Sequence, residues 1–468
     1  MQSLSKYNLS FRVMCVLALS TLFYSCKKFI SIDPPTTALV GISVFSDNTT
    51  ATAAVTGIYN RMMEANDQAS GLSQNISTFG ALSADEFISY STTADLNEFY
   101  ENAISKTNGY LTYNLWGNLY SYIYSANAII EGLSTSKTVS DAVKKQLTGE
   151  SKFIRAFCHF YLLNLFGDVP LITTTNYQLT AKTGRSAPTL VYQQVIADLK
   201  EAESMLASDY SYSKGERIRP NQWAASAMLA RVYLYTGDWA NAEAESGKLI
   251  GNTTMFSLLS DLNGVFLKNS QETILQLMPV SPGFNTMEGY NYILTTVPSI
   301  VSLNNQLLNS FEPGDYRRNN WIDSLTVDAQ TYYYPFKYKA MGGDPSIPVT
   351  EYAMFLRLAE QFLIRAEARA MQNNIAGAQD DLNVIRSRAG LSSTTANDQA
   401  ALLLAIEQER KVELFTEWGN RWFDLKRSGR ADIVLGPQKP GWKATAALYP
   451  IPLYEIQNNP QLSQNPGY

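Results

Sequence analysis

The clearest hydrophobic pattern along the chain is helical. From Trp116, apolar side chains recur at Tyr120, Ile123 and Ile130, a spacing that places them on one face of a helix. Asn127 falls on the same face. Because a buried amide needs hydrogen-bond partners, we expect Asn127 to act as a structural clamp rather than as a ligand group.

The next segment, residues 150–166, is apolar on two sides, which is typical of a helix packed between neighbours. Cys158 is expected to be a small core residue. His159 shares the remaining polar stripe with Arg155, and we expect it to be structural. Gly167 and Pro170 follow the last apolar turn and predict the end of the helix.

An internal repeat lies further along the chain. Residues 230–242 align with residues 366–378, and each copy predicts a helix, a tight turn containing Gly or Asn, and a second helix. Small residues in these positions let two antiparallel helices approach closely, as in tetratricopeptide-like hairpins. Between the copies, residues 251–350 look irregular, with a short β-like run at 273–278. Residues 66–110 form a second irregular stretch, and loop-rich stretches of this length usually carry function.

The first residues read as a secretory leader. The apolar run that starts at residue 13 is too short to span a bilayer as a helix, and it ends at a serine followed by Cys26. This resembles a bacterial lipobox, so we expect cleavage after residue 25 and acylation of Cys26; cleavage by the ordinary signal peptidase is the alternative. Residues 27–43 read as an extended tether.

The composition of the chain argues against several classes of function. The chain of 468 residues has 37 basic and 42 acidic side chains, a net charge of −5, and no basic block, so nucleic acid is not an expected partner. A Cys/His zinc site needs four such ligands close together, and the single histidine and three cysteines along the chain do not supply them. No nucleotide-binding loop or nucleophile elbow is present, so we expect no metal and no cofactor. The classes of function that remain are catalysis by carboxylates alone and binding without catalysis.

Six segments, in order, resemble the SusD/RagB family of Bacteroidetes nutrient-binding lipoproteins. They are the Trp116 helix and residues 149–171, 224–239, 358–390, 409–425 and 449–468. The resemblance implies a mostly α fold in which tetratricopeptide-like helical hairpins support an irregular, loop-rich ligand-binding half. It divides the chain into a signal peptide (1–25), an N-terminal region (26–220) and a C-terminal region (221–468) of one compact fold.

The resemblance also implies a role at the cell surface. A SusC-like TonB-dependent barrel in the outer membrane would be the partner, and the lipid-anchored protein would act as its lid and capture oligosaccharide, or peptide in some members. The matched motifs belong to the scaffold, so ligand residues cannot be carried over by position.

The candidate ligand-binding residues therefore come from the irregular stretches. An oligosaccharide is best held by exposed aromatic rings with polar groups on the rim, and the chain has 28 tyrosines. The candidates are Tyr90, Asn97, Phe99, Tyr100, Tyr290, Tyr292, Trp321 and Tyr332. An alternative for residues 332–334 is a strand with alternating faces.

Two other functions are weighed against nutrient capture. Glu409, Glu413 and Glu417 lie at i, i+4 and i+8 on one helix face, a spacing that superficially fits a glycosidase. Arg410 and Arg421 lie close by in the sequence, and pairing with arginine would lower the carboxylate pKa values, the wrong direction for a general acid. We therefore expect a structural ion-pair network and no catalytic residue. A helical scaffold for a protein partner is the third hypothesis.

Overall fold

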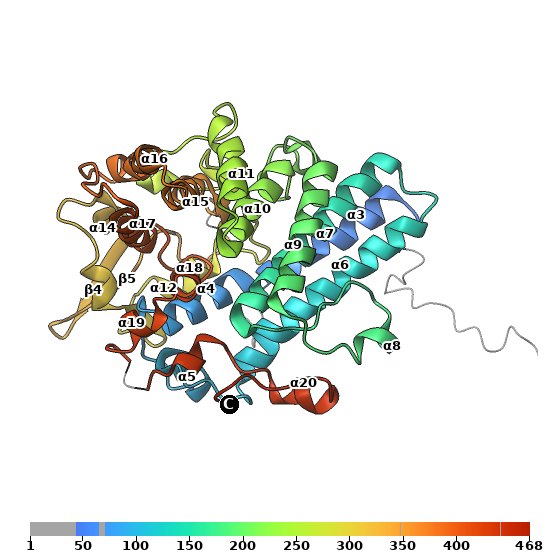
Figure 1. Cartoon of the computed structure of the whole chain (residues 1–468), viewed down its shortest axis with the longest axis horizontal. Helices are drawn as coiled ribbons and strands as arrows, with labels where there is room; N and C mark the ends of the chain where they lie inside the picture. The colour runs from blue at the N-terminus through green and yellow to red at the C-terminus, as the bar shows by residue number, and fades with distance from the viewer. Residues whose placement is uncertain (1–43, 65–70, 347, 440) are drawn as a thin grey trace, which may run out of the picture.

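The computed structural model describes residues 44–64, 71–346, 348–439 and 441–468, and over these ranges the chain is mostly helical, as predicted (Figure 1). The leader, Cys26 and the tether at 27–43 lie outside the described residues. The helices are α3 (Asn48–Met63), α4 (Leu72–Ser83), α5 (Ala94–Glu101), α6 (Asn118–Thr135), α7 (Asp141–Phe166), α8 (Tyr177–Thr180), α9 (Pro188–Met205), α10 (Gln222–Thr236), α11 (Trp239–Gly251), α12 (Met287–Tyr292), α13 (Asn305–Leu308), α14 (Tyr316–Asn320), α15 (Leu358–Met371), α16 (Ile375–Arg388), α17 (Gln399–Glu413), α18 (Asn420–Arg427), α19 (Ala431–Leu435) and α20 (Leu453–Asn458).

The strands pair two by two, always antiparallel. They are β1 (Phe87–Ser89) with β3 (Val301–Leu303), β2 (Thr273–Leu277) with β6 (Ala353–Arg357), and β4 (Ile322–Val327) with β5 (Gln330–Pro335). The β-like run predicted at 273–278 is confirmed as β2. Every residue of β2 and β6 is buried. The last residue of β6, Arg357, is therefore in the core, and α15 begins directly after it.

The N-terminal helices pack around α7. Its second half is almost wholly buried, and α3, α6 and α9 lie along it (Figure 1). Gly167, with φ of 74°, ends the helix as predicted, because this backbone conformation suits glycine. The segment before α6 differs from the expectation of one regular helix: Tyr110–Gly117, which contains Trp116, is π-helical.

The structural clamp expected at Asn127 is confirmed. The side chain is fully buried, its Oδ1 accepts a hydrogen bond from Arg155 Nη1 at 2.8 Å, and its Nδ2 donates to the carbonyl of Ile172 at 3.3 Å. Arg155 also pairs with Asp198 through two hydrogen bonds of 2.8 and 2.6 Å. One amide and one guanidinium thus connect α6, α7, α9 and the loop after α7.

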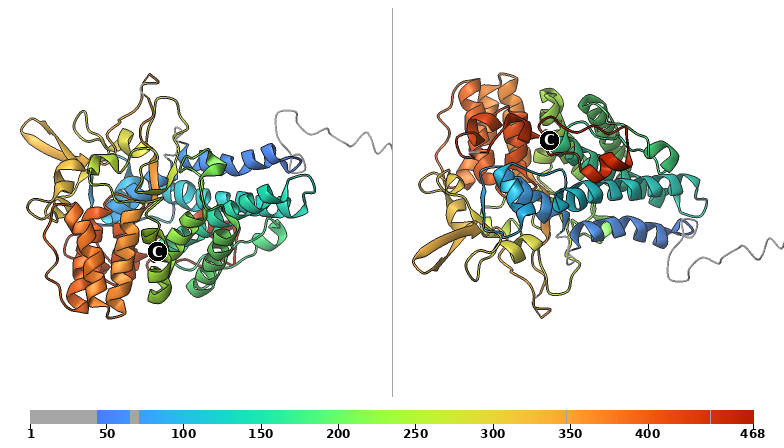
Figure 2. Two further views of the ribbon diagram at one scale, coloured as in Figure 1. Left: turned by 90° about the horizontal axis from the view of Figure 1, so that it is seen from above. Right: turned by 90° about the horizontal axis from the view of Figure 1, so that it is seen from below.

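The internal repeat forms two helical hairpins, α10–α11 and α15–α16. Gly237 and Asn373, which align in the repeat, both adopt positive φ angles, of 74° and 60°. The next residues also correspond, because Asp238 and Asn374 each cap the second helix by accepting a hydrogen bond from a backbone amide of its first turn. Helices α15, α16 and α17 stand side by side (Figure 2).

The loop-rich stretch expected at 251–350 is confirmed, with short helices and strands separated by long connections. The β4–β5 hairpin projects from this end of the molecule (Figure 2). The expectation for residues 66–110 was wrong, since two helices, α4 and α5, occupy much of this stretch. Every residue of α4 is buried, serines, asparagine and glutamine included, so tertiary packing overrides its weak helix propensity.

Candidate functional site

Two of the predicted tyrosines meet on the surface of the loop-rich half. Tyr90 directly follows β1, and its amide donates a hydrogen bond to the carbonyl of Ile300, which precedes β3, at 2.9 Å. Because β3 in turn packs beside β5, the ring of Tyr90 lies edge to face against that of Tyr332, with centroids 5.8 Å apart. Tyr90 is 38% exposed and Tyr332 is half-buried, so the pair presents apolar ring surface to solvent.

Asn97 shapes the loop that carries Tyr90. Its Oδ1 accepts a hydrogen bond from Ser89 Oγ at 2.5 Å, and its Nδ2 donates to the carbonyl of Ser91 at 2.9 Å. The amide is thereby tied to both sides of Tyr90. In this structure Asn97 positions the tyrosine, which is a different role from the expected contact with ligand.

The β4–β5 hairpin supplies polar groups around the two rings. Residues 332–334 belong to β5, so the alternative of an alternating strand is confirmed. Tyr334 lies on the same face as Tyr332, and its hydroxyl donates to Asp323 Oδ2 at 3.1 Å; burial and this carboxylate raise the pKa of Tyr334 to about 12. On the opposite face, the guanidinium of Arg318 lies 4.8 Å from the ring centre of Tyr333.

This arrangement suits a ligand with flat apolar faces and hydroxyl groups. Tyrosine offers a ring to stack on and a hydroxyl to hydrogen-bond, at low cost in side-chain entropy. We call Tyr90, Tyr332 and Asp323 the tyrosine face; Tyr334 is buried and holds Asp323 in place. Sequence reasoning missed Asp323, although it lies opposite Tyr334 in the hairpin register.

The other predicted residues lie elsewhere. Tyr290, on α12, is 41% exposed and packs against Phe284, with ring centroids 5.0 Å apart. Tyr100, at the end of α5, packs beside Lys439, whose Nζ lies 5.2 Å from the ring centre. Neither has a ring contact with Tyr90 or Tyr332 among those of the described residues.

Three predicted contact residues are in the core, and their burial does not fit a role in holding a ligand. Phe99 is fully buried and stacks on Phe79 with centroids 4.4 Å apart. Tyr292 is 2% exposed, and its hydroxyl lies 2.8 Å from that of Thr78. Trp321 is fully buried, and its Nε1 donates to the carbonyl of Leu262 at 3.0 Å. In each case a partner distant in the sequence covers the ring.

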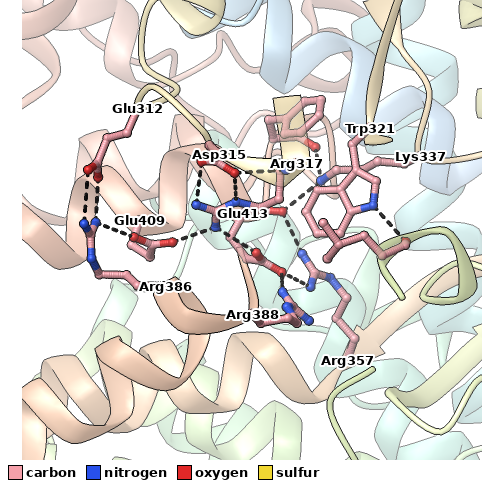
Figure 3. Close-up of polar contacts among 12 residues, drawn as sticks. Glu312, Asp315, Arg317, Trp321, Lys337, Arg357, Arg386, Arg388, Glu409 and Glu413 are labelled. Carbon is pink, nitrogen blue, oxygen red and sulfur yellow. Dashed lines mark hydrogen bonds and ion pairs between the residues drawn. The ribbon is translucent and has the colours of Figure 1, made fainter. Parts of the chain in front are cut away.

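The carboxylate ladder of α17 and the residues after it is confirmed as an ion-pair network (Figure 3). Glu413 is fully buried and binds Arg317 at 3.0 Å, Arg357 at 2.5 Å, and also Arg388. Glu409 binds Arg317 at 2.6 Å. Trp321 lies against this cluster, with the guanidinium carbons of Arg357 and Arg388 each 5.8 Å from its ring centre.

The pKa values in this network follow from burial and from the number of arginines. Burial raises the pKa of Glu413, but its three guanidinium partners more than offset this and hold it well below the ordinary value. The pKa of Glu417 is lowered in the same way, by Arg357 and Lys337. Glu409 differs from the expectation, because burial outweighs Arg317 and raises its pKa. Its carboxylate is only 1% exposed and is paired with arginine, so no polysaccharide can reach it.

His159 is structural, as expected. It is fully buried, its Nδ1 lies 3.1 Å from the carbonyl oxygen of Arg155, and its Nε2 accepts a hydrogen bond from the amide of Ile172 at 3.3 Å. Burial and the neighbouring guanidinium lower the pKa of His159 to about 3, so the imidazole is neutral. Cys158 is also fully buried, and burial raises the pKa of its thiol, which makes it an inert core residue.

No helix in the described ranges is long and apolar enough to cross a bilayer. Across those same ranges, no three Cys, His, Asp or Glu side chains gather in a way that could hold a metal ion.

Comparison with known protein families gives two matches, one in each half of the chain. A model described as "Starch-binding associating with outer membrane" matches residues 43–234, and a SusD family model matches residues 303–468. Among curated relatives, SusD-like protein P25 of Formosa agariphila is 25% identical over 95% of this chain and 97% of its own length. The starch-binding protein SusD of Bacteroides thetaiotaomicron is 23% identical over 72% of this chain and 75% of its own.

Solved structures with this fold cover nearly the whole chain. A SusD superfamily protein from Bacteroides vulgatus superposes with a TM-score of 0.79 at 22% identity, over 91% of this chain and all of its own. A laminarin-binding SusD-like protein superposes with a TM-score of 0.75 at 25% identity, over 90% of this chain and 99% of its own.

Proposed function

This chain belongs to the SusD/RagB family, and we propose that it is a non-catalytic, lipid-anchored protein of the cell surface that binds oligosaccharides and delivers them to a SusC-like TonB-dependent transporter in the outer membrane. The observation that carries the binding role is the pair of Tyr90 and Tyr332, two rings from distant parts of the chain that meet on the surface of the loop-rich half.

The chemistry of the tyrosine face supports a carbohydrate as ligand. The rings of Tyr90 and Tyr332 can stack on the flat faces of sugar rings, while Asp323 and the tyrosine hydroxyls can bind sugar hydroxyls. Relatives described as starch-binding and laminarin-binding make the same ligand class reasonable here. The glutamates that fit a glycosidase by spacing are buried and paired with arginine, which supports binding without cleavage.

The proposed location rests on the sequence of the first residues. In this proposal, residues 1–25 are removed, Cys26 is acylated, and residues 27–43 tether the fold, whose regions 26–220 and 221–468 form one body. Several acyl chains would hold the protein firmly to a membrane, since each buried methylene contributes about 0.8 kcal/mol. The protein would then lie at the outer membrane beside its transporter.

Calorimetric titration tests which class of ligand the protein binds. The chain from residue 27 onward is titrated with a panel of oligosaccharides and peptides, and each mixture is then examined for cleavage products. We expect saturable binding of one glycan class, with a dissociation constant of about 1 μM or weaker because a delivery protein must release its cargo, and no cleavage.

Three variants connect that binding to the tyrosine face. Tyr90→Ala and Tyr332→Ala should each weaken binding at least about tenfold. The control is Tyr124→Ala, which removes a 59% exposed tyrosine from α6 and should leave affinity unchanged. Binding of peptides alone would change the cargo to peptide. Cleavage of any glycan, or glycan binding that survives both substitutions in the tyrosine face, would contradict the proposal.

A further inference from the structure

The helical half contains a cavity that shares no residue with the tyrosine face. Its volume is about 490 Å³, within the range of sites for small organic molecules. Five helices contribute to its wall, namely α10, α11, α15, α17 and α18. The wall is apolar over much of its surface, through side chains that include Leu234, Trp239, Met371, Leu403 and Leu404.

Arg410 distinguishes this cavity from a simple gap between helices. Its side chain lines the cavity and is only 1% exposed, and its Nε donates to Asp424 Oδ2 at 2.7 Å. Within the described part of the chain, neither Nη1 nor Nη2 has a hydrogen-bond partner. A buried guanidinium with two unpaired nitrogens is costly, because both groups have lost water without gaining an acceptor.

Arg427 gives a direct comparison within the same cavity wall. Its Nη1 and Nη2 donate to the two oxygens of Glu367 at 2.5 and 2.8 Å, and its Nε donates to Asp424 Oδ1 at 2.8 Å. The two arginines therefore share Asp424 through their Nε atoms, but only Arg427 has a carboxylate for the other two nitrogens. Among the described residues, no corresponding acceptor reaches Nη1 and Nη2 of Arg410.

The surrounding charges also leave room for one more carboxylate. In the ion pairs that extend from the cavity, five basic side chains share four carboxylates; they are Arg410, Lys411, Arg421, Arg427 and Arg430 with Asp85, Glu367, Glu407 and Asp424. Asp85 and Glu407 each serve two of these bases. An added carboxylate would balance this group.

We propose that the cavity binds a small organic carboxylate. Its two oxygens accept hydrogen bonds from Nη1 and Nη2 of Arg410 in the fork geometry that guanidinium groups prefer. The apolar body of the ligand packs against Trp239, Leu403 and Leu404. The carboxylate can come from a free acid or from the C-terminus of a short peptide, and both present the same chemistry to Arg410.

Saturation-transfer NMR and calorimetry on the chain from residue 27 onward test the site, with phenylbutyrate as the probe and phenylbutanamide as its uncharged counterpart. We expect the acid to bind with a dissociation constant of about 1 mM or tighter, and the amide at least about tenfold more weakly. Acetyl-leucyl-phenylalanine, as free acid and as amide, forms the second arm. Tighter binding of phenylbutyrate would identify a free acid as the ligand, and tighter binding of the peptide acid would identify the C-terminus of a short peptide. Either result supports the site.

Three variants locate the binding. Leu404→Trp fills the mouth of the cavity, where Leu404 is 53% exposed, and should weaken binding of the acid at least about tenfold without lowering the unfolding temperature. Ile433→Trp adds the same ring at a 67% exposed position outside the cavity wall and should change nothing. Arg410→Lys keeps the charge but loses the fork, and should also weaken binding. Equal affinity for acid and amide, no detectable binding of either acid, or unchanged binding to Leu404→Trp would overturn the proposal.

Discussion

Gly80 in α4 lies directly against Gly419, the residue that precedes α18. A Cβ at position 80 would be 2.6 Å from the Cα of Gly419, a distance that real side chains do not tolerate. The buried helix α4 thereby packs closely against the residue just before α18, although the two helices are far apart in the chain.

Gly80→Ala should therefore destabilise the protein, by about 1–3 kcal/mol, because α4 or the backbone at 419 has to shift. The matched control is Gly57→Ala in α3, where an added Cβ would meet nothing within 4 Å. There alanine should raise the free energy of unfolding by about 0.4–1 kcal/mol, through reduced freedom of the unfolded chain. Urea denaturation measures both. Equal effects of the two substitutions would contradict the close contact.

The helix α4 shows that composition can mislead where the spacing of apolar residues is informative. Its apolar residues do recur with helical spacing, at Leu72, Ile76, Phe79 and Leu82, but the Ser, Asn, Gln, Thr and Gly between them have weak helix propensity and favoured the expectation of a loop. The helix α7 was predictable because its apolar residues cover two sides in a regular pattern, and the hairpins were predictable from the repeat. What the sequence could not indicate is that the polar residues of α4 are buried too, because the elements that cover them are distant in the chain.

The same reasoning explains the candidate site. The sequence predicted a binding surface in the tyrosine-rich loops, and Tyr90 and Tyr332 are at least partly exposed there. The sequence could not distinguish an exposed ring from a buried one. Trp321, for example, is buried by the loop that contains Leu262 and by the arginines beside it. Whether a loop side chain is covered depends on strand register and on long-range pairing, and neither leaves a local signal.

Glu413→Gln should be one of the most damaging substitutions on α17. The carboxylate is fully buried among Arg317, Arg357 and Arg388, and the amide would leave three guanidinium groups with too little negative charge. Loss of one partner from a buried network costs about 3–5 kcal/mol. Glu312→Gln is the control: Glu312 pairs with Arg386 but is 45% exposed, so its loss should cost less than about 1 kcal/mol. Comparable losses from both variants in urea denaturation would contradict this.

Glu86 should make the protein less stable as the pH rises. Its carboxyl is 1% exposed, and burial, together with the negative charge of Asp85, raises its pKa from 4.5 to about 8. Between these two values the folded state holds a proton that the unfolded state has lost, so the free energy of unfolding falls across that window. Glu86→Gln cannot ionise. Its stability relative to the native sequence should therefore be greater at about pH 8.5 than at about pH 5. A difference that is the same at both pH values would show that Glu86 is ionised in the folded protein.

The pKa of His159 can be measured directly, because it is the only histidine in the chain. The buried imidazole has a pKa of about 3, against 6.5 for the ordinary value. In chain purified without a histidine tag, the proton NMR signal of the imidazole should stay constant from pH 8 down to about pH 5 and titrate near pH 6.5 only in urea.

The same difference links His159 to acid sensitivity. Between pH values of about 6.5 and 3, the unfolded state binds a proton that the folded state does not bind, so stability falls as the pH falls through this window. His159→Gln removes that proton uptake and should flatten the acid side of the stability profile, even where the substitution lowers stability at neutral pH by disturbing the hydrogen bond from the Ile172 amide. If the imidazole of the folded protein titrated near its ordinary pKa, His159 would be open to solvent. His159→Gln would then leave the dependence of stability on acid pH unchanged, which would contradict this prediction.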